Sequence, residues 1–460
     1  MRLPLISGYL ELDPPPRRFL MYVAINVVSW QNIVGPATIL FARKIDMPES
    51  LVGAMLSFMP FSTLLLLFTV PLIIRLGPKR VMMTAWLMRN IITCLVFLMP
   101  LALATGSKRL AWGVLLAAVF GFCVMRAFGA GGWLPWLHEI VPVKKRSVYF
   151  STEAAITQLI NVAVLFTQAR LLAVSEPGVN RFLLIFGLGI VMGFISLLWM
   201  RRIPGGEGAP QVDAVSGLNA LKRAVSDRSF LVFMLVSIFG MTGLSWFGAA
   251  YVMYLRDALG ARDSLNMSLS AMGGLGILLT VGSWARFTEQ NGSGLSMAKT
   301  LTAHALAPLL FLLAGAGYAN TTALPLLAVV IACVFNAAFH VAVNRAMLNH
   351  VPDHDRVGYT AVWTVCTALT LGATPLVAGF IIEYWGMWGF RACFLFSIFT
   401  TLGGAALSMV FVHERVVFEK NWTEMLNPAL PLRTMGRILW ITLGLHESNR
   451  NNAAAGKTPE

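Results

Sequence analysis

One arginine stands far from either end of a long apolar run. Arg126 lies within residues 110–138, about 17 residues after Arg109 and about 18 before Lys144. If this run is a membrane helix rising ~1.5 Å per residue, each end lies roughly 25 Å away, beyond the reach of the side chain. An arginine at mid-membrane costs at least ~2.5–3.5 kcal/mol on insertion scales. We therefore expect Arg126 either to face a cavity and bind an anionic group of a solute, or to bind carbonyl groups and waters between helices.

A second polar feature lies in the apolar run at residues 323–348. Asn336, His340 and Asn344 are spaced by four, which places them on one face of a helix. Asn336 also lies 210 residues after Arg126. Because a polar stripe in lipid must face protein or water, we expect Asn336 and His340 to line the same solute site as Arg126. His340 could also take up a proton near neutral pH, although a lone histidine is more often a satisfied hydrogen-bonding residue.

Polar and aromatic residues of the first and seventh apolar runs complete the predicted solute site. They are Asn26, Trp30, Gln31 and Trp246. Asn26 and Trp30 are four residues apart and share a helical face. Packing explains each of these residues equally well, and only their convergence in space would make them a site.

Acidic residues are nearly absent from the apolar runs. Only Glu153 and Glu383 lie inside them, each near one end of its run. Glu153 is the best candidate for an acid that takes up a proton or that neutralises a nearby cation in a gate. The chain shows no nucleophile beside a base and no cluster of metal ligands, since His304 and His340 are isolated. We therefore expect no catalytic residue, no metal and no cofactor.

The composition indicates that the chain lies in a lipid bilayer. Of its 460 residues, 57% are hydrophobic and only 12% are charged, and the mean hydropathy is +0.72. A soluble globular chain carries roughly a quarter charged residues. The net charge of +14 does not indicate nucleic-acid binding, because the cations stand in short clusters between apolar runs.

Twelve apolar runs are each long enough to cross the ~30 Å hydrocarbon core as a helix. They are continuous and do not alternate with polar residues, which favours helices over barrel strands. The runs are 19–42, 50–74, 81–104, 110–138, 148–172, 181–200, 230–255, 265–285, 297–318, 323–348, 358–384 and 388–412. Lysine and arginine are roughly twice as frequent on the side of the N-terminus as on the other side. This bias predicts a multi-pass protein of the inner cell membrane with both termini in the cytoplasm.

The runs form two sets of six, separated by a long polar connection. We expect a cytoplasmic N-terminus at 1–18, a six-helix bundle at 19–200, a cytoplasmic linker at 201–229, a second six-helix bundle at 230–412 and a cytoplasmic tail at 413–460. Residues 215–225 of the linker and the tail segment LRTMGRILWITLGL have the patterns of a surface helix and an interfacial helix. The predicted fold class is an all-α integral membrane protein with twelve transmembrane helices in two pseudo-symmetric six-helix bundles.

A repeated nonapeptide supports the duplication. Residues 141–149 read VPVKKRSVY and residues 351–359 read VPDHDRVGY, 210 residues later, so both share V-P-x-x-x-R-x-x-Y. The proline cannot continue a helix without losing an amide bond, so it ends the preceding one. We expect Arg146 and Arg356 to stand at the start of the next helix, at equivalent places of the two halves.

With these features the chain resembles the major facilitator superfamily across nearly its whole length. The family pattern between the second and third helices reads roughly G-x-x-x-D-R-x-G-R-R, and this chain has PLIIRLGPKR. Arg75, Gly77, Lys79 and Arg80 match that pattern. Pro71 and Ile74 depart from it, so the acid that helps to join the halves in the family is replaced here by an isoleucine.

The resemblance implies a secondary transporter whose halves rock around a site near the bilayer midplane. A small organic solute, anionic or amphipathic, is favoured because the deep charge is positive. The expected partners are that solute and the lipid bilayer, with no nucleic acid and a monomeric state. A membrane receptor or an assembly factor on the same scaffold, without transport, stays open as an alternative. The residues that we place in gates or in coupling are Arg75, Gly77, Lys79, Arg80, Arg146, Glu153 and Arg356.

Overall fold

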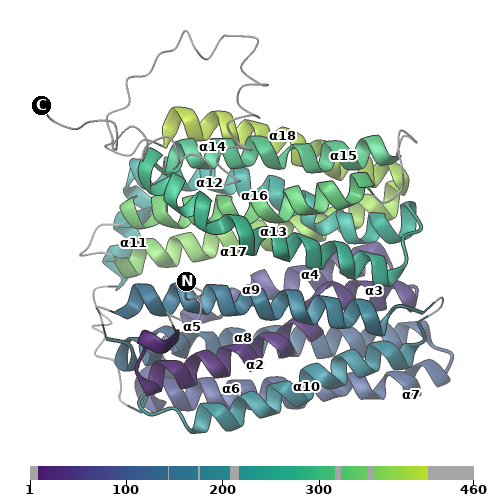
Figure 1. The fold of residues 1–460 in the computed structure, drawn as a ribbon, viewed down its shortest axis with the longest axis horizontal. Helices are drawn as coiled ribbons and strands as arrows, with labels where there is room; N and C mark the ends of the chain where they lie inside the picture. Colours follow the sequence, from purple (N-terminus) through teal and green to yellow (C-terminus); the bar gives the residue numbers. More distant parts are fainter. Residues whose placement is uncertain are drawn as a thin grey trace, which may run out of the picture.

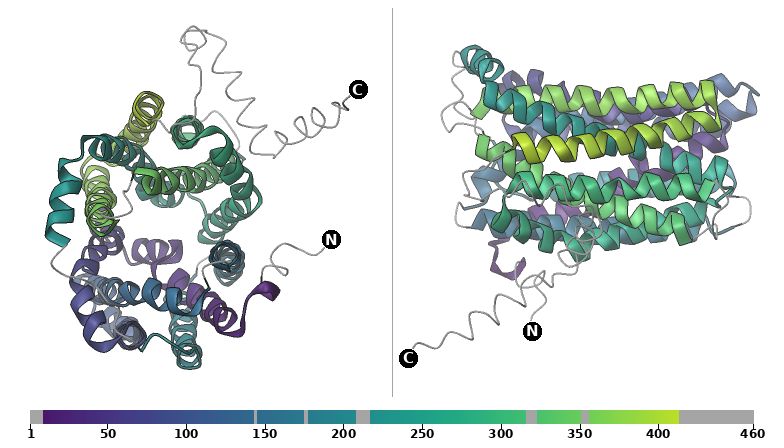
Figure 2. Two further views of the ribbon diagram at one scale, coloured as in Figure 1. Left: turned by 90° about the vertical axis from the view of Figure 1, so that its left-hand side faces the viewer. Right: turned by 90° about the horizontal axis from the view of Figure 1, so that it is seen from above.

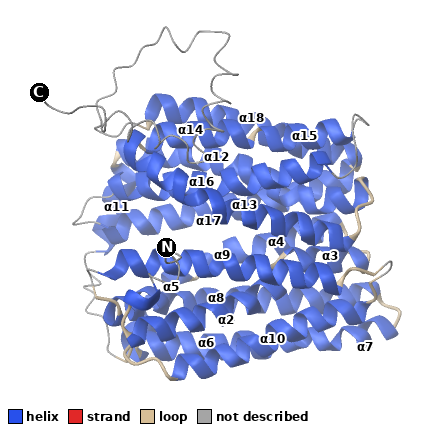
Figure 3. Ribbon diagram, viewed as in Figure 1, coloured by secondary structure: helices blue, strands red, loops and turns tan. Residues whose placement is uncertain are grey.

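The computed structural model describes residues 9–142, 145–174, 177–207, 217–315, 323–350 and 356–412. Within these ranges every regular element is a helix, as Figure 3 shows. The first half contains α2 (Pro14–Val34), α3 (Pro36–Lys44), α4 (Glu49–Thr63), α5 (Leu66–Leu76), α6 (Pro78–Thr93), η1 (Cys94–Leu98), α7 (Met99–Ala104), α8 (Lys108–Ile140), α9 (Arg146–Leu171) and α10 (Val179–Arg201). The second contains α12 (Arg228–Met253), η4 (Tyr254–Ala258), α13 (Asp263–Asn291), α14 (Ser293–His304), α15 (Leu306–Gly315), α16 (Ala323–His350), α17 (Arg356–Trp385) and α18 (Met387–Phe411), and α11 (Gly217–Ser226) lies between the halves in sequence.

The twelve predicted runs coincide with these helices. Eleven helical segments of the described ranges are long and apolar enough to cross a membrane. The remaining run, 50–74, is divided into α4 and α5 by a turn at Leu64 and Leu65. Each piece is too short to span a bilayer alone, but the two follow one another in the same layer. The sequence therefore predicted the span and not its interruption.

The first span is also broken, and here the reason is local. Gly35 has an extended backbone, with φ −81° and ψ −177°, and Pro36 begins α3. Proline has no amide hydrogen to donate and disfavours a helical residue before it. The span therefore changes direction between α2 and α3.

The helices pack in two groups that repeat one another. We number the spans 1 to 12 in chain order, with α2–α3 as span 1 and α18 as span 12. In the first half, α2 packs on α10 and α6 packs on α8, which are the pairs 1–6 and 3–4. In the second, α12 packs on α18 and α14 packs on α16, the corresponding pairs 7–12 and 9–10. Figure 1 shows the first half (purple to blue) beneath the second (green to yellow).

Contacts between the groups obey the same symmetry. The halves meet where α4 packs on α17 and where α9 packs on α13, which are spans 2–11 and 5–8. Exchanging the halves turns span 2 into span 8 and span 11 into span 5. It therefore converts one pair into the other, as a twofold axis between the halves requires. The end-on view in Figure 2 shows the helices arranged side by side around this boundary.

Large apolar side chains cover the outside of the bundle. Phe68, Leu279 and Phe399 have 71%, 77% and 69% of their surface exposed. Soluble monomers rarely expose extended apolar surface, so lipid is the solvent that fits it. The predicted helix start is confirmed for α9, which begins at Arg146, whereas α17 is described only from Arg356 because residues 351–355 lie outside the described part of the chain. The predicted tail helix lies outside the described residues, whereas the predicted linker helix is present as α11, packed on α17.

The start of α2 and the finish of α18 lie at the same end of the bundle, which we call the terminal end. It carries the connections that follow α5, α8, α10 and α13. The other end, which we call the distal end, carries the connections at 45–48, 105–107 and 259–262. An even number of spans places the start of α2 and the finish of α18 together.

Candidate functional site

The deep arginine of α8 has no polar partner in the part of the chain that the structure describes. Arg126 is partly exposed and makes no hydrogen bond or ion pair to a described residue. The groups within electrostatic range of it are Cys123 of the same helix and Tyr22 of α2. A guanidinium without a counter-charge at this depth can bind an anionic group.

A second deep arginine is held by aromatic rings and hydrogen bonds, although its Nη1 has no hydrogen-bond partner among the described residues. Arg89 of α6 is fully buried between the rings of Trp86 and Phe122, with its guanidinium carbon 4.8 Å and 4.7 Å from their centroids. Its Nη2 donates to Asn26 Oδ1 at 3.0 Å, and its Nε donates to Asn90 Oδ1 at 3.3 Å. Stacking and charged hydrogen bonds together compensate the lost hydration of the cation.

This arrangement also places Asn26, which the sequence put in the solute site. Its Oδ1 accepts hydrogen bonds from Arg89 and from Trp86 Nε1, the latter at 2.9 Å. In this state the amide oxygen of Asn26 therefore joins α2 to α6 within the first half.

The aromatic and amide candidates are spread over both halves. Gln31 is buried, with 6% of its surface exposed, and Trp30 packs against a hydrophobic cluster that contains residues of both halves. Trp246 of α12 packs on Phe396 of α18, with ring centroids 5.3 Å apart. These contacts do not bring Gln31 or Trp246 together with Arg126.

Two residues of the polar stripe of α16, Asn336 and His340, are partly buried, whereas Asn344 is exposed. Asn336 Oδ1 is buried and has no hydrogen-bond partner among the described residues. His340 is partly exposed one turn further along the helix. Both side chains therefore have unused hydrogen-bonding capacity in the second half.

Glu153 of α9 makes no ion pair with Arg75 or Arg80 in the described structure, and both arginines are exposed. Its Oε2 and the hydroxyl of Tyr149, one turn away, are buried without hydrogen-bond partners among the described residues. The side chains of Arg146 and Arg356 lie outside the described part of the chain.

The motif between spans 2 and 3 holds the start of the linker to the first half. Lys79 donates through its backbone to Gly206 O at 2.9 Å and through Nζ to Ile203 O at 2.6 Å. Gly77 has φ +81°, a conformation that favours glycine, and a Cβ there would lie 3.0 Å from the carbonyl oxygen of Glu207. In this state both residues therefore contact the linker and not the opposite half.

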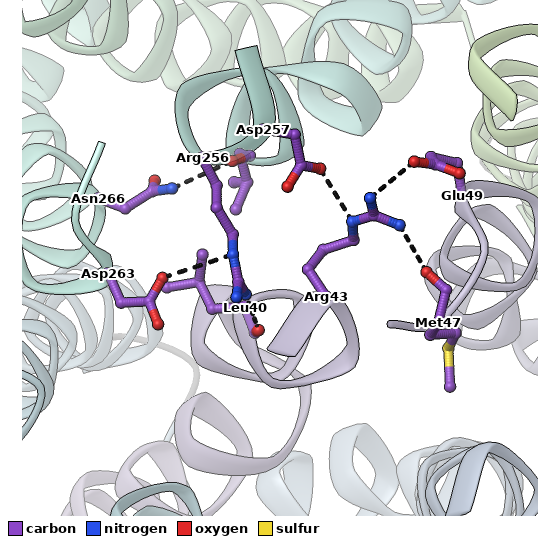
Figure 4. A network of polar contacts seen from close by, with 9 residues as sticks. Leu40, Arg43, Met47, Glu49, Arg256, Asp257, Asp263 and Asn266 are labelled. Carbon is purple, nitrogen blue, oxygen red and sulfur yellow. Dashed lines mark hydrogen bonds and ion pairs between the residues drawn. The ribbon is translucent and has the colours of Figure 1, made fainter. Parts of the chain in front are cut away.

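Sequence reasoning missed a charged network that joins the halves at the distal end (Figure 4). Arg43, near the end of α3, donates through Nε to Asp257 Oδ2 of the second half at 2.9 Å. The same guanidinium pairs with Glu49 at 2.7 Å and donates to the carbonyl oxygen of Met47 at 2.6 Å. One side chain thus links the first span, the second span and the seventh.

A second arginine crosses in the opposite direction. Arg256 of the second half donates to the carbonyl oxygen of Leu40 and lies 3.9 Å from the carboxylate of Asp263. Arg256 and Asp257 occupy η4, a π-helical turn, and such turns often occur at functional sites. The sequence signal for this network is that charged residues lie at the ends of apolar runs, namely Arg43, Glu49, Arg256, Asp257 and Asp263. The count of lysines and arginines used Arg43 and Arg256 only to predict the orientation in the membrane.

Close backbone packing lies beside this network. The amide of Ser50 in α4 donates to Glu383 Oε2 of α17 at 2.9 Å. One turn further, a Cβ on Gly53 would lie 2.3 Å from the carbonyl oxygen of Pro375 and 3.0 Å from Gly379 Cα. The two halves are therefore in direct contact at the distal end.

Another distal ion pair stays within the first half. Lys108 Nζ donates to Asp46 Oδ2 at 2.7 Å, and both side chains are largely exposed. This hydrogen bond and the charge of Lys108 hold the pKa of Asp46 below its ordinary value. The pair offers a natural control for the network that joins the halves.

No protein-family model and no curated protein sequence matches the chain. Among solved structures, it is similar to a mutant of the nucleoside transporter NupG, with a TM-score of 0.67 and 13% identity over 87% of this chain and 100% of that one. It is also similar to a bacterial homologue of the iron transporter ferroportin in an inward-facing state, with a TM-score of 0.66 and 14% identity over 87% of this chain and 99% of that one. For the outward-facing state of a bacterial ferroportin homologue the TM-score is 0.56, with 14% identity and the same coverage.

The spans and these likenesses define a multi-pass membrane protein made of two six-helix halves. Its fold is that of the major facilitator superfamily, as the sequence resemblance predicted.

Proposed function

We propose that this protein is a secondary transporter that moves a small organic solute across the inner cell membrane by alternating access. The observation that carries the proposal is the charged network at the distal end, where Arg43 pairs with Asp257 of the other half. Ion pairs between side chains at helix ends can break and form again as two halves rock, whereas a fused core cannot. The solved structures that share this fold are transporters, which supports the proposal.

In this account the distal end is the outer side of the membrane and is closed in the present state. The higher TM-score with an inward-facing ferroportin homologue, 0.66 against 0.56 for the outward-facing one, agrees with a closed outer side. Both termini are then cytoplasmic. The inner gate contains Arg75, Gly77, Lys79, Arg80, Arg146, Glu153 and Arg356, with Gly77 and Lys79 acting through the linker.

The solute site lies between the gates and is anchored by Arg126. An unneutralised guanidinium favours an anionic or amphipathic solute. Asn336 and His340 supply hydrogen-bonding groups from the second half. The protein works as a monomer in the bilayer, since each half provides part of the pathway.

The test is uptake into proteoliposomes of a panel of organic anions, cations, sugars and nucleosides, with and without a reducible cross-link at the distal end. The cross-link joins Ser50→Cys to Glu383→Cys in a variant whose five native cysteines are replaced. We expect cross-linking to abolish uptake and reduction to restore it, because the outer gate can no longer open.

A matched control joins Asp46→Cys to Lys108→Cys, which both belong to the first half. This cross-link should leave uptake within twofold of the unlinked variant. Uptake that continues unchanged after complete linkage of residues 50 and 383 would contradict alternating access. Accumulation of no panel solute above protein-free vesicles would contradict transport of a solute of these classes.

A further inference from the structure

A cavity of about 250 Å³ lies beside the break in the first span. It is lined by α2, α3, α4 and α8 of the first half and is partly open on one side. The residues around it are Val34, Gly35, Thr38, Ile39, Met55, Leu56, Met59, Pro60, Val119 and Cys123. The change of direction at Gly35 and Pro36 gives the cavity one of its walls.

The lining offers almost nothing to a polar ligand. The hydroxyl of Thr38 already donates to the carbonyl oxygen of Ile33 at 2.7 Å. The other side chains are aliphatic, apart from the thiol of Cys123. Engineered apolar cavities of about 150 Å³ stay dry and bind benzene. A larger apolar cavity therefore suits an apolar group of more than one ring.

The wall formed by α8 ends in a charge. Val119, Cys123 and Arg126 are spaced i, i+4 and i+7, so they lie on one face of α8. Val119 and Cys123 line the cavity, and Arg126 follows Cys123 by about 4.5 Å along the axis toward the terminal end. On α2, Trp30 precedes the lining residue Val34 by one turn and shares its face.

The cation at this edge is not neutralised by its surroundings. Arg126 makes no ion pair with a described residue, and Tyr22 of α2 is an ionisable group of a neighbouring helix that interacts with it. The next cation, Arg89, interacts with it repulsively. An apolar chamber that borders an unpaired guanidinium is complementary to a molecule with an apolar body and one negative charge.

We infer that the solute of the proposed transporter is a compact amphipathic organic anion, whose apolar ring system occupies the cavity between α2, α3, α4 and α8 while its carboxylate or sulfonate pairs with Arg126. The statement that this molecule is transported rests on the proposed function. The binding site itself can be tested by a binding measurement alone. The cavity selects the apolar body by size, and Arg126 selects the charge.

The test measures thermal unfolding of the purified protein in detergent against four probes, because a ligand that binds only the folded form raises the midpoint. The probes are 2-naphthoate, the neutral analogue 2-naphthylmethanol, benzoate and acetate. We expect 2-naphthoate to raise the midpoint with an affinity at least tenfold above that of each other probe. Equal stabilisation by the neutral analogue would overturn the role of Arg126, and equal stabilisation by acetate would overturn the role of the cavity.

Variants separate the two parts of the site. Val119→Phe fills the cavity and Arg126→Gln removes the charge, and each should weaken 2-naphthoate binding at least tenfold. Ala117→Phe, at an exposed position of the same helix, is the matched control and should bind as the wild type does. Leu56→Phe fills the cavity from α4 if Val119→Phe does not fold. Undiminished binding to a folded cavity-filling variant would overturn the inference.

Failure of the site and failure of transport give different results. If 2-naphthoate binds in this pattern but does not enter proteoliposomes, the site stands and the transport proposal fails for this class of solute. If another panel solute accumulates while 2-naphthoate neither binds nor accumulates, transport stands and the inference fails.

Discussion

Two arginines lie deep in the first half, and only their surroundings distinguish them. Arg89 is stacked between two rings and hydrogen-bonded to two asparagines. Arg126 is partly exposed and has no such partner among the described residues. A buried cation with partners stabilises the fold, whereas one without partners is costly and indicates a binding role.

This difference predicts opposite effects on stability. Asn26→Leu removes the acceptor of Arg89 and Trp86, and the loss of a buried hydrogen bond to a charged group costs about 1.5–3 kcal/mol. Its unfolding midpoint in detergent should therefore fall. Arg126→Gln should leave the midpoint unchanged or raise it, because it removes a charge that has no partner. Destabilisation by Arg126→Gln as large as that by Asn26→Leu would indicate a structural role for Arg126.

At the scale of helices, the halves approach most closely where side chains are smallest. Gly53 of α4 and Gly379 of α17 face each other, and a Cβ on either would lie about 3 Å from the Cα of the other. Small residues at such a crossing allow helices to pack in lipid, where apolar surface alone gives little drive to associate. The break at Pro36 acts at the same scale, since it turns α3 toward this end.

The crossing predicts that Gly53→Ala separates α4 from α17. Its new methyl group would lie 2.3 Å from the carbonyl oxygen of Pro375, so one helix must move. The unfolding midpoint should fall. Gly248→Ala on α12 is the control, because no atom lies within 4 Å of its Cβ and the change gains about 0.8–1 kcal/mol of helix propensity. A midpoint for Gly53→Ala at or above that of Gly248→Ala would show that the crossing is not tight in the membrane protein.

At the scale of the whole molecule, the distal network is the contact that keeps the outer side closed in the transport cycle that we propose. Arg43 and Arg256 reach across the boundary in opposite directions, from spans 1 and 7. These spans are related by the pseudo-twofold axis, so each half contributes one arginine to the network. Its charged side chains have about one-fifth of their surface exposed. They therefore attract one another more strongly than fully solvated ions do, and they can still separate.

Loss of one cation should therefore open the distal end. In a background without the native cysteines, a cysteine at position 50 should react several times faster with a membrane-impermeant maleimide in Arg43→Gln than in the parent. Lys108→Gln removes a distal cation from a pair that lies within one half and is exposed by 63% and 69%, so it should leave the rate within twofold. Equal rates in all three proteins would contradict the assignment of Arg43 to a gate.

The sequence by itself determined the spans, their number in each half and the place of each polar residue along its helix. These properties follow from local hydropathy and from the spacing of residues on a helix. Neither depends on which helices pack against one another. The end of α8 at Ile140, two residues before Pro142, follows in the same way from that proline.

Only the tertiary structure decided which polar residues meet. It paired Asn26 with Arg89, placed an apolar cavity against Val119 and Cys123 of the helix that carries Arg126, and joined Arg43 to Asp257 across 214 residues of sequence. Hydropathy assigns a depth to each side chain but not a neighbour, because the neighbour depends on how whole helices rotate and cross. For this reason the sequence could give the depth of Arg126 but not the groups around it.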